Sequence, residues 1–522
     1  MHPLTMLEID LDSVLAKCLS RPGGILLAIL IILYGSHWMR SWLFSIVDKL
    51  FPLETALPRM PKPVGHDFRE TMRQGILKYP DQAWVIPFQD PTVILPHSSL
   101  ESHVKKIPEP DLTLNGNMYK RFFGKYTQVG TDDAELVSAL KFDLTQNVHG
   151  LLGEMTEEVA FAFNRVLGPL KTWQAFSTYP TLLQVVAHTS GRVFVGLPLS
   201  RDEAWIQASI QHTIGSVQFS DKLREYQSWL RPFAAPFLKE RRVMQDIQDR
   251  VASHLDPIIT KRLAMQAESE EKTSPQKHDS QVGRMTGWLL GHYEKSTAKP
   301  DRSRLVRDHL TLSFAAIHVA SMALSHIMHE LAARPEYIQI LREELETELA
   351  SCGGGSLNSK SLANLAKMDS LIKEAIRLNP SGIVAWTRLA TKPIRLPSNQ
   401  VIPKGTMIAY CNPRFNPTLE PCINSDEFDG LRFVKLIEKE GPQARYKADS
   451  LSHDSLNFGY GIHACPGRAF AIAELKLIVA HIIINYDVRL PGGQKKVETI
   501  YWDFQIMPDP NAKLELRPRK LV

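Results

Sequence analysis

The stretch Phe458-Gly459-Tyr460-Gly461-Ile462-His463-Ala464-Cys465-Pro466-Gly467-Arg468 decides the fold of this chain. Its glycines let the backbone turn tightly and approach a flat ligand closely, because they carry no Cβ. The residues from Arg468 to Leu477 follow the apolar period of a helix, and Pro466 and Gly467 restrict the chain just before it. The Cys465 sulfur is therefore predicted at a helix N-terminus. Unpaired N–H groups there lower the pKa of a thiol and favour the thiolate, which is a metal ligand.

Six positions of this stretch match the pattern F-G-x-G-x-x-x-C-x-G-[RK], which resembles the haem-binding loop of the cytochrome P450 family. They are Phe458, Gly459, Gly461, Cys465, Gly467 and Arg468. The resemblance implies a mostly α-helical haem-thiolate fold with small β-sheets, and iron protoporphyrin IX held by Cys465 as the axial ligand. The alternative is a buried cysteine that packs as a small hydrophobe in a glycine turn. That alternative explains a lone cysteine but not the whole pattern.

A second motif, Lys373-Glu374-Ala375-Ile376-Arg377-Leu378-Asn379-Pro380, ends a helical stretch that begins near Ala363. Glu374 and Arg377 are three residues apart on one helix face, a spacing that by itself predicts only a weak surface contact. The motif resembles the family's E-x-x-R, and Arg432 in Phe428-Asp429-Gly430-Leu431-Arg432-Phe433 matches its third member. The resemblance implies a structural cluster in which two guanidinium groups share the Glu374 carboxylate and hold the haem loop against the core.

Cations near the expected haem are predicted from position. Residues 386–390 and 401–406 are typical of two strands separated by a turn-rich segment. Arg388 matches the place where the family commonly binds a haem propionate, and His463 and Arg468 are further candidates for the same contact. Each of them is otherwise a solvated surface cation. The family's W-x-x-x-R is not found, and Lys141 is a guess at the equivalent cation.

A long helix is predicted from Asp308 to Ala333, with Pro335 after its end. Its centre resembles the family's oxygen-binding helix, in which small residues such as Ala315 and Ala316 leave room for dioxygen. The acid's position in that helix holds His318 and the threonine's position holds Val319, which has no hydroxyl. Either His318 relays protons itself, or it is a buried, hydrogen-bonded histidine and Ser321 or a water acts in its place.

Residues expected to line the substrate space are mainly apolar. They are Phe314, Ala315, Ile317, His318, Val319, Ile383, Val384, Gln505 and Ile506. This composition suits a terpenoid or polyketide-like substrate, although ordinary core packing explains it equally well.

The overall composition is that of a globular protein, with 44% hydrophobic and 22% charged residues. A net charge of +5 over 522 residues is slight and gives no reason to expect nucleic-acid binding. The five cysteines are few and odd in number and contain no C-x-x-C, so neither a disulfide scaffold nor a zinc site is indicated.

The N-terminal region is predicted to anchor the chain in a membrane. Residues 22–39 carry no charged side chain, and a transmembrane helix over 22–47 is long enough to span a bilayer. Acidic residues before this run disfavour a cleaved signal peptide. More cations follow the span than precede it, which places the short N-terminus 1–21 in the lumen and the catalytic domain 66–522 in the cytosol, after a proline-rich linker 48–65.

The resemblance implies a monooxygenase of the endoplasmic reticulum membrane, similar to fungal enzymes of secondary metabolite biosynthesis. No flavin or dinucleotide motif is present in the sequence, so electrons are expected from NADPH through a separate NADPH-cytochrome P450 reductase. Membrane lipid and a hydrophobic small molecule are the other expected partners. Two alternatives remain open: desaturation, coupling or cyclisation in place of hydroxylation, because of Val319, and a haem-binding homologue without catalytic activity.

Overall fold

The computed structural model describes residues 57–102, 106–131, 134–271, 283–296, 301–353, 356–419 and 426–519. Pro58–Val522 form a compact unit of their own, divided from Met1–Leu57. The predicted N-terminus 1–21, the span 22–47 and the first half of the linker 48–65 lie outside the described residues. The second unit begins inside the predicted linker, because Arg59 pairs with Val85 and the Met60 side chain is buried.

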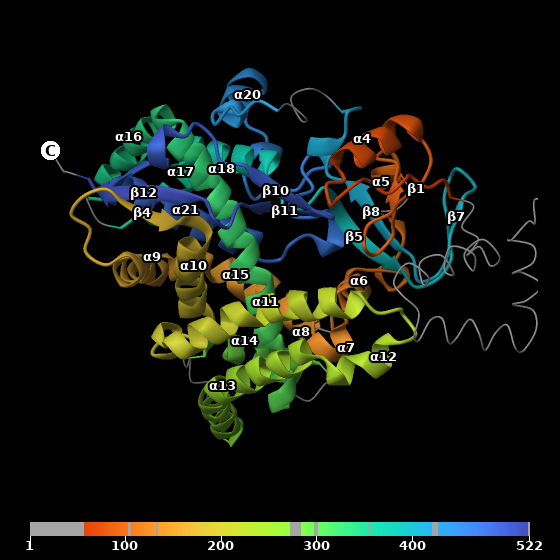
Figure 1. The fold of residues 1–522 in the computed structure, drawn as a ribbon. Helices are drawn as coiled ribbons and strands as arrows, with labels where there is room; N and C mark the ends of the chain where they lie inside the picture. Colours follow the sequence, from red (N-terminus) through yellow and green to blue (C-terminus); the bar gives the residue numbers. More distant parts are fainter. Residues whose placement is uncertain are drawn as a thin grey trace, which may run out of the picture. The chain divides into compact units, whose positions relative to one another are not determined.

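Helices make up most of the second unit, so the prediction of a mostly helical fold with small sheets is confirmed (Figure 1). They are α4 (Arg69–Lys78), α5 (Ser99–Ser102), α6 (Leu114–Arg121), α7 (Gly124–Thr127), α8 (Ala134–Ser138), the π-helix η3 (Ala139–Leu144), α9 (Thr145–Leu167), α10 (Thr178–Phe194), α11 (Glu203–Arg224), α12 (Arg231–Ala234), α13 (Lys239–Glu271), α14 (Arg284–Lys295), α15 (Arg302–Ala333), α16 (Pro335–Ser351), α17 (Ser359–Asn364), α18 (Ala366–Leu378), α20 (Arg432–Glu440) and α21 (Arg468–Asn485).

The strands form small sheets. The largest has the order β1-β2-β8-β5-β3, with β2 and β8 parallel and the other neighbours antiparallel. Its members are β1 (Trp84–Ile86), β2 (Thr92–Leu95), β3 (Leu112–Thr113), β5 (Val384–Ala390) and β8 (Met407–Cys411). The others are β4 (Gln174–Ser177) with β12 (Lys513–Pro518) and β9 (Tyr486–Arg489), β6 (Ile394–Arg395) with β7 (Val401–Ile402), and β10 (Thr499–Trp502) with β11 (Gln505–Pro508). The strand predicted at 386–390 is confirmed as β5.

Helix α15 is the centre of the hydrophobic core. It begins six residues before the predicted start, because the Asp301 side chain caps it by accepting a hydrogen bond from the Arg304 N–H at 2.6 Å. It contacts α10, α11, α13, α18 and α21. Among the described residues, α15 alone is long and apolar enough to cross a membrane, but 61% of its most apolar window is buried inside the protein. Its apolar character therefore serves the core.

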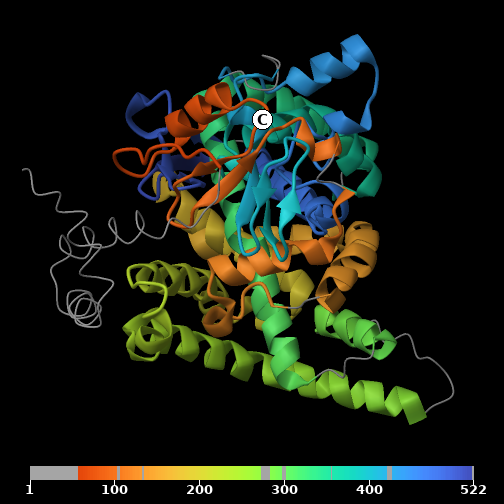
Figure 2. The same ribbon diagram turned by 90° about the vertical axis from the view of Figure 1, so that its right-hand side faces the viewer.

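The two ribbon views agree on the arrangement around α15. In Figures 1 and 2, α13 crosses one end of α15, and the strands of the five-stranded sheet lie toward the other end. Helix α21 also packs on α15. The loop before α21 and the middle of α15 are consequently brought to the same interior space.

Candidate active site

The loop before α21 holds Cys465 at a defined place. The Cys465 N–H donates to the Phe458 carbonyl oxygen at 2.8 Å, which closes the loop. Gly459 and Gly461 have φ values of 71° and 73°, a region that favours glycine. Helix α21 then begins at Arg468, so the prediction of a cysteine just before a helix start is confirmed.

Two opposing effects act on the pKa of the Cys465 thiol. Burial raises the pKa of Cys465, and the hydrogen bond from the Gly467 backbone and the Arg468 charge oppose this shift only in part. Desolvation outweighs the helix N-terminus because the sulfur is removed from water. A bound metal ion, which deprotonates a coordinating thiol outright, would be needed to hold the thiolate.

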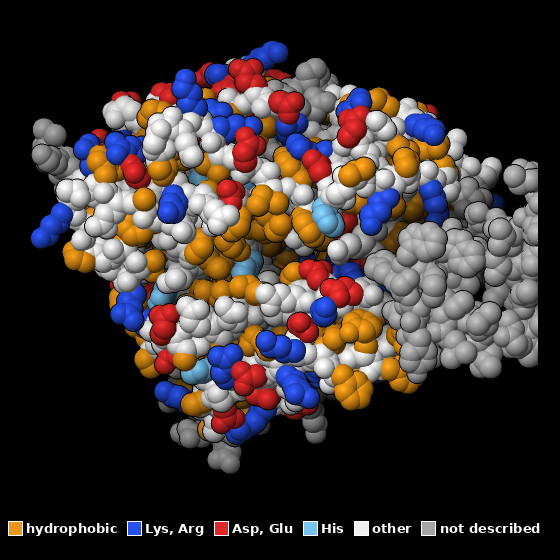
Figure 3. All heavy atoms as spheres, viewed as in Figure 1, with side chains coloured by type: hydrophobic (Ala, Val, Ile, Leu, Met, Phe, Trp, Pro, Cys, Tyr) orange, Lys and Arg blue, Asp and Glu red, His pale blue; other side chains and the backbone are white. Residues whose placement is uncertain are grey.

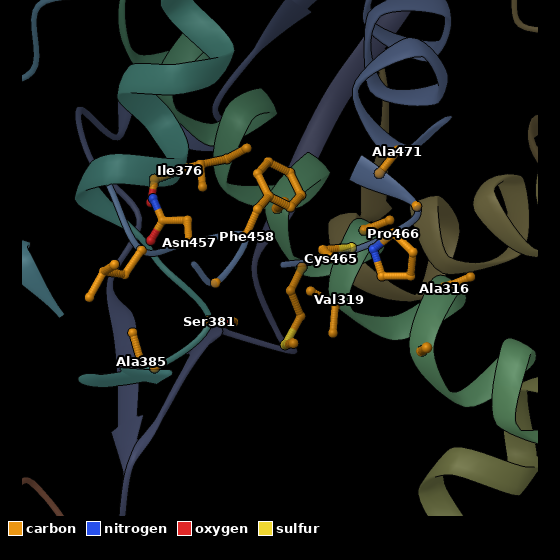
Figure 4. Close-up of a pocket in the computed structure, with 18 of the residues that line it drawn as sticks. Ala316, Val319, Ile376, Ser381, Ala385, Asn457, Phe458, Cys465, Pro466 and Ala471 are labelled. Carbon is orange, nitrogen blue, oxygen red and sulfur yellow. The ribbon is translucent and has the colours of Figure 1, made fainter. Parts of the chain in front are cut away.

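A cavity of about 470 Å³ lies between this loop and α15. In Figure 4, Phe458, Cys465 and Pro466 enter it from the loop, and Ala316 and Val319 enter it from α15. A Cβ built at Gly467 would meet no atom within 4 Å, so glycine leaves this part of the cavity open. The remaining lining is largely apolar and comes from α6, η3, α18, β5, α21 and the β10–β11 turn.

A buried cation adjoins this apolar space. Arg388 lines the cavity and is only 3% exposed; its Nη1 donates to the Thr387 carbonyl oxygen at 2.8 Å, and its Cζ lies 4.2 Å from the Trp386 ring centroid. A buried guanidinium favours an anionic group beside it. These features fit an iron porphyrin. The Cys465 sulfur suits the iron, the open space at Gly467 and the apolar walls suit the ring, and the Arg388 cation suits the acidic side chains of the porphyrin.

The other predicted propionate contacts are placed differently. Arg468 does not line the cavity, because its Nη1 donates to the Cys465 carbonyl oxygen at 3.0 Å. Lys141 contacts the cysteine loop through the Ile462 carbonyl oxygen, 3.3 Å from its Nζ, and does not line the cavity either. The side chain of His463 lies outside the described residues.

The structure brings Glu374, Arg377 and Arg432 together. Arg377 donates to both carboxylate oxygens of Glu374, with Nε–Oε2 at 2.7 Å and Nη2–Oε1 at 2.9 Å. Arg432 Nε lies 3.1 Å from each oxygen, and the Asp429 N–H adds a bond at 3.0 Å. Glu374 is fully buried, and every lone pair it presents has a donor, which is the condition under which a buried carboxylate is stable.

Helix α15 presents one face to the cavity. The residues on that face are Leu312, Ala315, Ala316, Val319, Ala320, Met322, Ala323 and His326. The Val319 side chain is 47% exposed, and because Val319 lines the cavity, its exposed surface faces the cavity. Its methyl groups stand where the resemblance expects a hydroxyl.

Of the two alternatives for His318, the structure agrees with the buried, hydrogen-bonded histidine, and neither His318 nor Ser321 lines the cavity. Nδ1 of His318 lies 2.7 Å from the Tyr179 hydroxyl, and Nε2 lies 3.1 Å from the Ile210 carbonyl oxygen. The Ser321 hydroxyl donates to the Ile317 carbonyl oxygen at 2.6 Å. Both side chains lie on faces of α15 that pack against other parts of the protein.

The predicted substrate residues divide in the same way. Ala315, Val384 and Ile506 line the cavity together with Val319. The remaining ones, Phe314, Ile317, Ile383 and Gln505, do not. Phe314 packs edge-on against Phe122 instead, with centroids 5.1 Å apart.

Two titratable residues that line the cavity were not predicted from the sequence. His326 lines it with no hydrogen-bond partner at Nε2 among the described residues, and burial lowers its pKa to about 3. Glu474 lines it from α21, accepts a bond from Ser190 Oγ at 2.8 Å, and has its pKa raised to about 8 by burial. Helical spacing would have found His326, because it is seven residues after Val319 and so lies on the same face.

Comparison with known proteins gives a consistent result. The family model described as Cytochrome P450 matches residues 139–516. The chain is 34% identical over 479 residues to Cytochrome P450 monooxygenase ascG of Acremonium egyptiacum, a match that covers 87% of this chain and 89% of that protein. It is 35% identical over 476 residues to Cytochrome P450 monooxygenase BOA7 of Botryotinia fuckeliana, with coverage of 87% and 88%. With Cytochrome P450 monooxygenase gliF of Aspergillus fumigatus the identity is 34% over 492 residues, covering 92% and 95%.

Proposed function

This chain belongs to the cytochrome P450 family and is a monooxygenase, and we propose that it oxidises a hydrophobic terpenoid or polyketide-like small molecule in secondary metabolite biosynthesis. Its similarity to fungal monooxygenases supports this place in metabolism. The apolar lining of the 470 Å³ cavity supports a hydrophobic substrate. The same similarity speaks against a homologue without catalytic activity.

The observation that carries the proposal is the shared cavity of Cys465 and the Val319 face of α15. Cys465 would ligate the haem iron, Phe458, Gly459 and Gly467 would lie beside the ring, and Arg388 would meet a propionate. When bound, the haem supplies the activation of dioxygen, which thiolate ligation favours. The chain's own part is to orient the substrate and to exclude water with apolar side chains such as Leu312, Val384 and Ile506.

Proton supply to this cavity is restricted. Of the α15 residues that line it, only His326 carries a group that exchanges protons, and burial keeps His326 neutral at physiological pH. Protons therefore arrive through water or from Glu474 of α21, which also lines the cavity, because general acid transfer needs a donor within hydrogen-bond reach or one water away.

This restriction favours a second candidate function. We infer that the lack of a hydroxyl at Val319 alters proton delivery, and that the substrate is then diverted to loss of a second hydrogen, coupling or cyclisation in place of hydroxylation. The net reaction is then a desaturation, coupling or cyclisation carried out at the same site.

We also propose the partners and the location. The family implies a reductase as electron donor, here an NADPH-cytochrome P450 reductase. The uncharged run 22–39 and the larger number of cations after it support attachment to the endoplasmic reticulum membrane by residues 22–47, with the catalytic unit in the cytosol. Exposed aromatic side chains at and beside α12 support a lipid contact: Trp229, Phe233 and Phe237 are 47%, 70% and 82% exposed. Figure 3 shows hydrophobic side chains on the surface in the region of α12.

The test uses Cys465→Ser with Cys411→Ser as the control, because Cys411 is a buried free cysteine that does not line the cavity. In the reduced, CO-treated protein, Cys465→Ser should lose the absorption band that gives the family its name, and Cys411→Ser should keep it. Products formed with a reductase, NADPH and labelled dioxygen then separate the two functions. Label in the product indicates monooxygenation, and an oxidised product without label indicates the alternative. A Cys465→Ser protein that keeps the band would refute the assigned ligand.

A further inference from the structure

A second, smaller cavity of about 40 Å³ adjoins the candidate active site. It lies where α6 meets α11 and the β10–β11 hairpin, and acidic and basic side chains gather near this end of α11 in Figure 3. Phe504 is the residue that lines both cavities, so its ring stands between them. The lining comprises Gln89, Asp90, Arg121, Phe122, Val217, Asp221, Arg224, Trp502, Asp503, Phe504 and Gln505.

Arg121 is the unusual member of this lining. It is 3% exposed, and its Nε and Nη2 have no hydrogen-bond partner among the described residues. Its Cζ lies 3.9 Å from the centroid of the Phe504 ring. Burial lowers the pKa of Arg121 to about 10, so the guanidinium still carries its charge at neutral pH. A buried cation with open donors is costly unless something accepts its hydrogen bonds.

The acidic neighbours have other partners. Asp90 accepts from Arg224 Nε at 2.9 Å, and Asp221 accepts from Arg224 Nη1 at 2.9 Å. Asp503 accepts from the Gln89 N–H at 3.1 Å. The lining thus holds two guanidinium groups against three carboxylates, an excess of one negative charge. That excess repels an anion, and a cation offers no lone pair to the open N–H donors of Arg121, so a neutral acceptor fits best.

We propose that Arg121 binds an uncharged oxygen acceptor at the far end of the substrate, such as the carbonyl of a ketone, ester or lactone. The proposal rests on the proposed function, because it requires that the substrate occupy the large cavity. At roughly 10–15 Å³ for each water-sized group, the small cavity holds about three such groups, which is the size of an ester end. The substrate passes along the Phe504 ring to reach the donors.

The alternative is a purely structural arginine whose stacking on Phe504 is its whole role. The two roles differ in what they recognise. Stacking favours any apolar chain equally, whereas open N–H donors add affinity only for a ligand that carries an acceptor.

The experiment compares three probes of one chain length on the purified holoenzyme: methyl dodecanoate, dodecanoate and dodecane. The dissociation constant of each is read from the change in haem absorbance. Wild type should bind the ester more tightly than either of the others. Arg121→Met should weaken ester binding by about tenfold or more and leave dodecane binding unchanged. Arg121→Gln keeps an N–H donor, so its dissociation constant for the ester should lie between those of wild type and Arg121→Met.

Arg241→Met is the matched control, because Arg241 also lies over an aromatic ring, 5.5 Å from the Tyr126 centroid, but lines neither cavity. It should behave as wild type. Equal binding of ester and dodecane by wild type, absence of ester binding, or an unchanged ester preference in Arg121→Met would each overturn the proposal. Failure of the proposed function is separate, because the reduced protein would then lack the thiolate–CO band before any probe is added.

Discussion

The Tyr179 hydroxyl lies 2.7 Å from Nδ1 of His318, and this contact joins α10 to α15. On the other side of the ring, Nε2 lies 3.1 Å from the Ile210 carbonyl oxygen of α11. A neutral imidazole has one donor and one acceptor, so Nε2 donates to the carbonyl and Nδ1 accepts from the tyrosine. Burial lowers the pKa of His318, which keeps the ring in this neutral state. His318 thus connects three helices, and Val319 beside it faces the cavity.

Tyr179→Phe should therefore change stability and not catalysis. It removes the donor to Nδ1, which should lower the free energy of unfolding by about 1 kcal/mol, measured by chemical denaturation. Coupling, the share of NADPH converted to product, should stay the same because His318 does not line the cavity. Tyr119→Phe, at an exposed position, is the control. Altered coupling at unchanged stability would show that His318 takes part in proton delivery.

Buried histidines should make the protein less stable in mild acid. Burial lowers the pKa of His212 and of His309 to about 4, whereas an unfolded histidine has a pKa of about 6.5. Between these values the unfolded chain binds more protons than the folded chain, so stability rises with pH across this window and is lost as the pH falls.

The measurement is the denaturant midpoint at pH 7 and at pH 5. Each such histidine should contribute a loss of about 1–2 kcal/mol over that range. His309→Gln should flatten the pH dependence, and His453→Gln, at an exposed position, should not. Parallel pH profiles for wild type and His309→Gln would show that His309 does not titrate as its burial requires.

Glu374→Gln should destabilise the unit strongly. Two guanidinium groups would be left without their shared negative charge in a buried place, and breaking a buried ion pair costs about 3–5 kcal/mol. Thermal unfolding and haem content measure the effect. The control is Glu515→Gln, whose partner Arg489 is 52% exposed, so its loss should change stability by less than about 1 kcal/mol. Equal effects of the two substitutions would contradict a structural role for the cluster.

Deleting residues 1–50 should release the protein from membranes and leave its haem in place. The cavity and its lining all belong to the second unit, which begins at Pro58. Partition between membrane pellet and supernatant after a salt and carbonate wash measures the release. If the truncated chain stays in the pellet, replacement of Phe233 and Phe237 by Ser should release it; retention after that change would rule out α12 as the lipid contact.

The sequence alone predicted those features that depend only on residues close together in the chain. The cysteine loop, the helix after it, the long α15 and strand β5 each depend on spacing and turn chemistry within a few residues of one another. The direction of single side chains on α15 was not predictable in this way. Neighbouring residues on a helix differ by roughly 100° in direction, so a choice between His318 and Val319 requires knowing which side the cavity lies on.

Contacts between distant segments were equally out of reach. Arg121 and Phe504 are far apart in the sequence, and only the packing of α6 against the β10–β11 turn brings them together. The effect of burial on the pKa of Cys465 was not predictable for a related reason. The helix N-terminus is visible in the sequence, whereas the burial that outweighs it depends on the whole fold.

Val319→Thr tests whether the missing hydroxyl decides the reaction. The cavity face of α15 has no hydroxyl group among the described residues, and neither His318 nor Ser321 replaces it. A threonine of nearly the same shape would add a hydroxyl donor to this face of the cavity, and proton transfer needs a donor within about 2.6–3.2 Å of the acceptor. We expect better coupling, measured as product formed against NADPH consumed, and under the second candidate function we also expect a larger share of hydroxylated product at the expense of the native one. Val319→Ala changes the volume without adding a donor, so it should not shift products toward hydroxylation. If Thr and Ala have the same effect, position 319 acts through packing alone, and protons reach the site by water without help from α15.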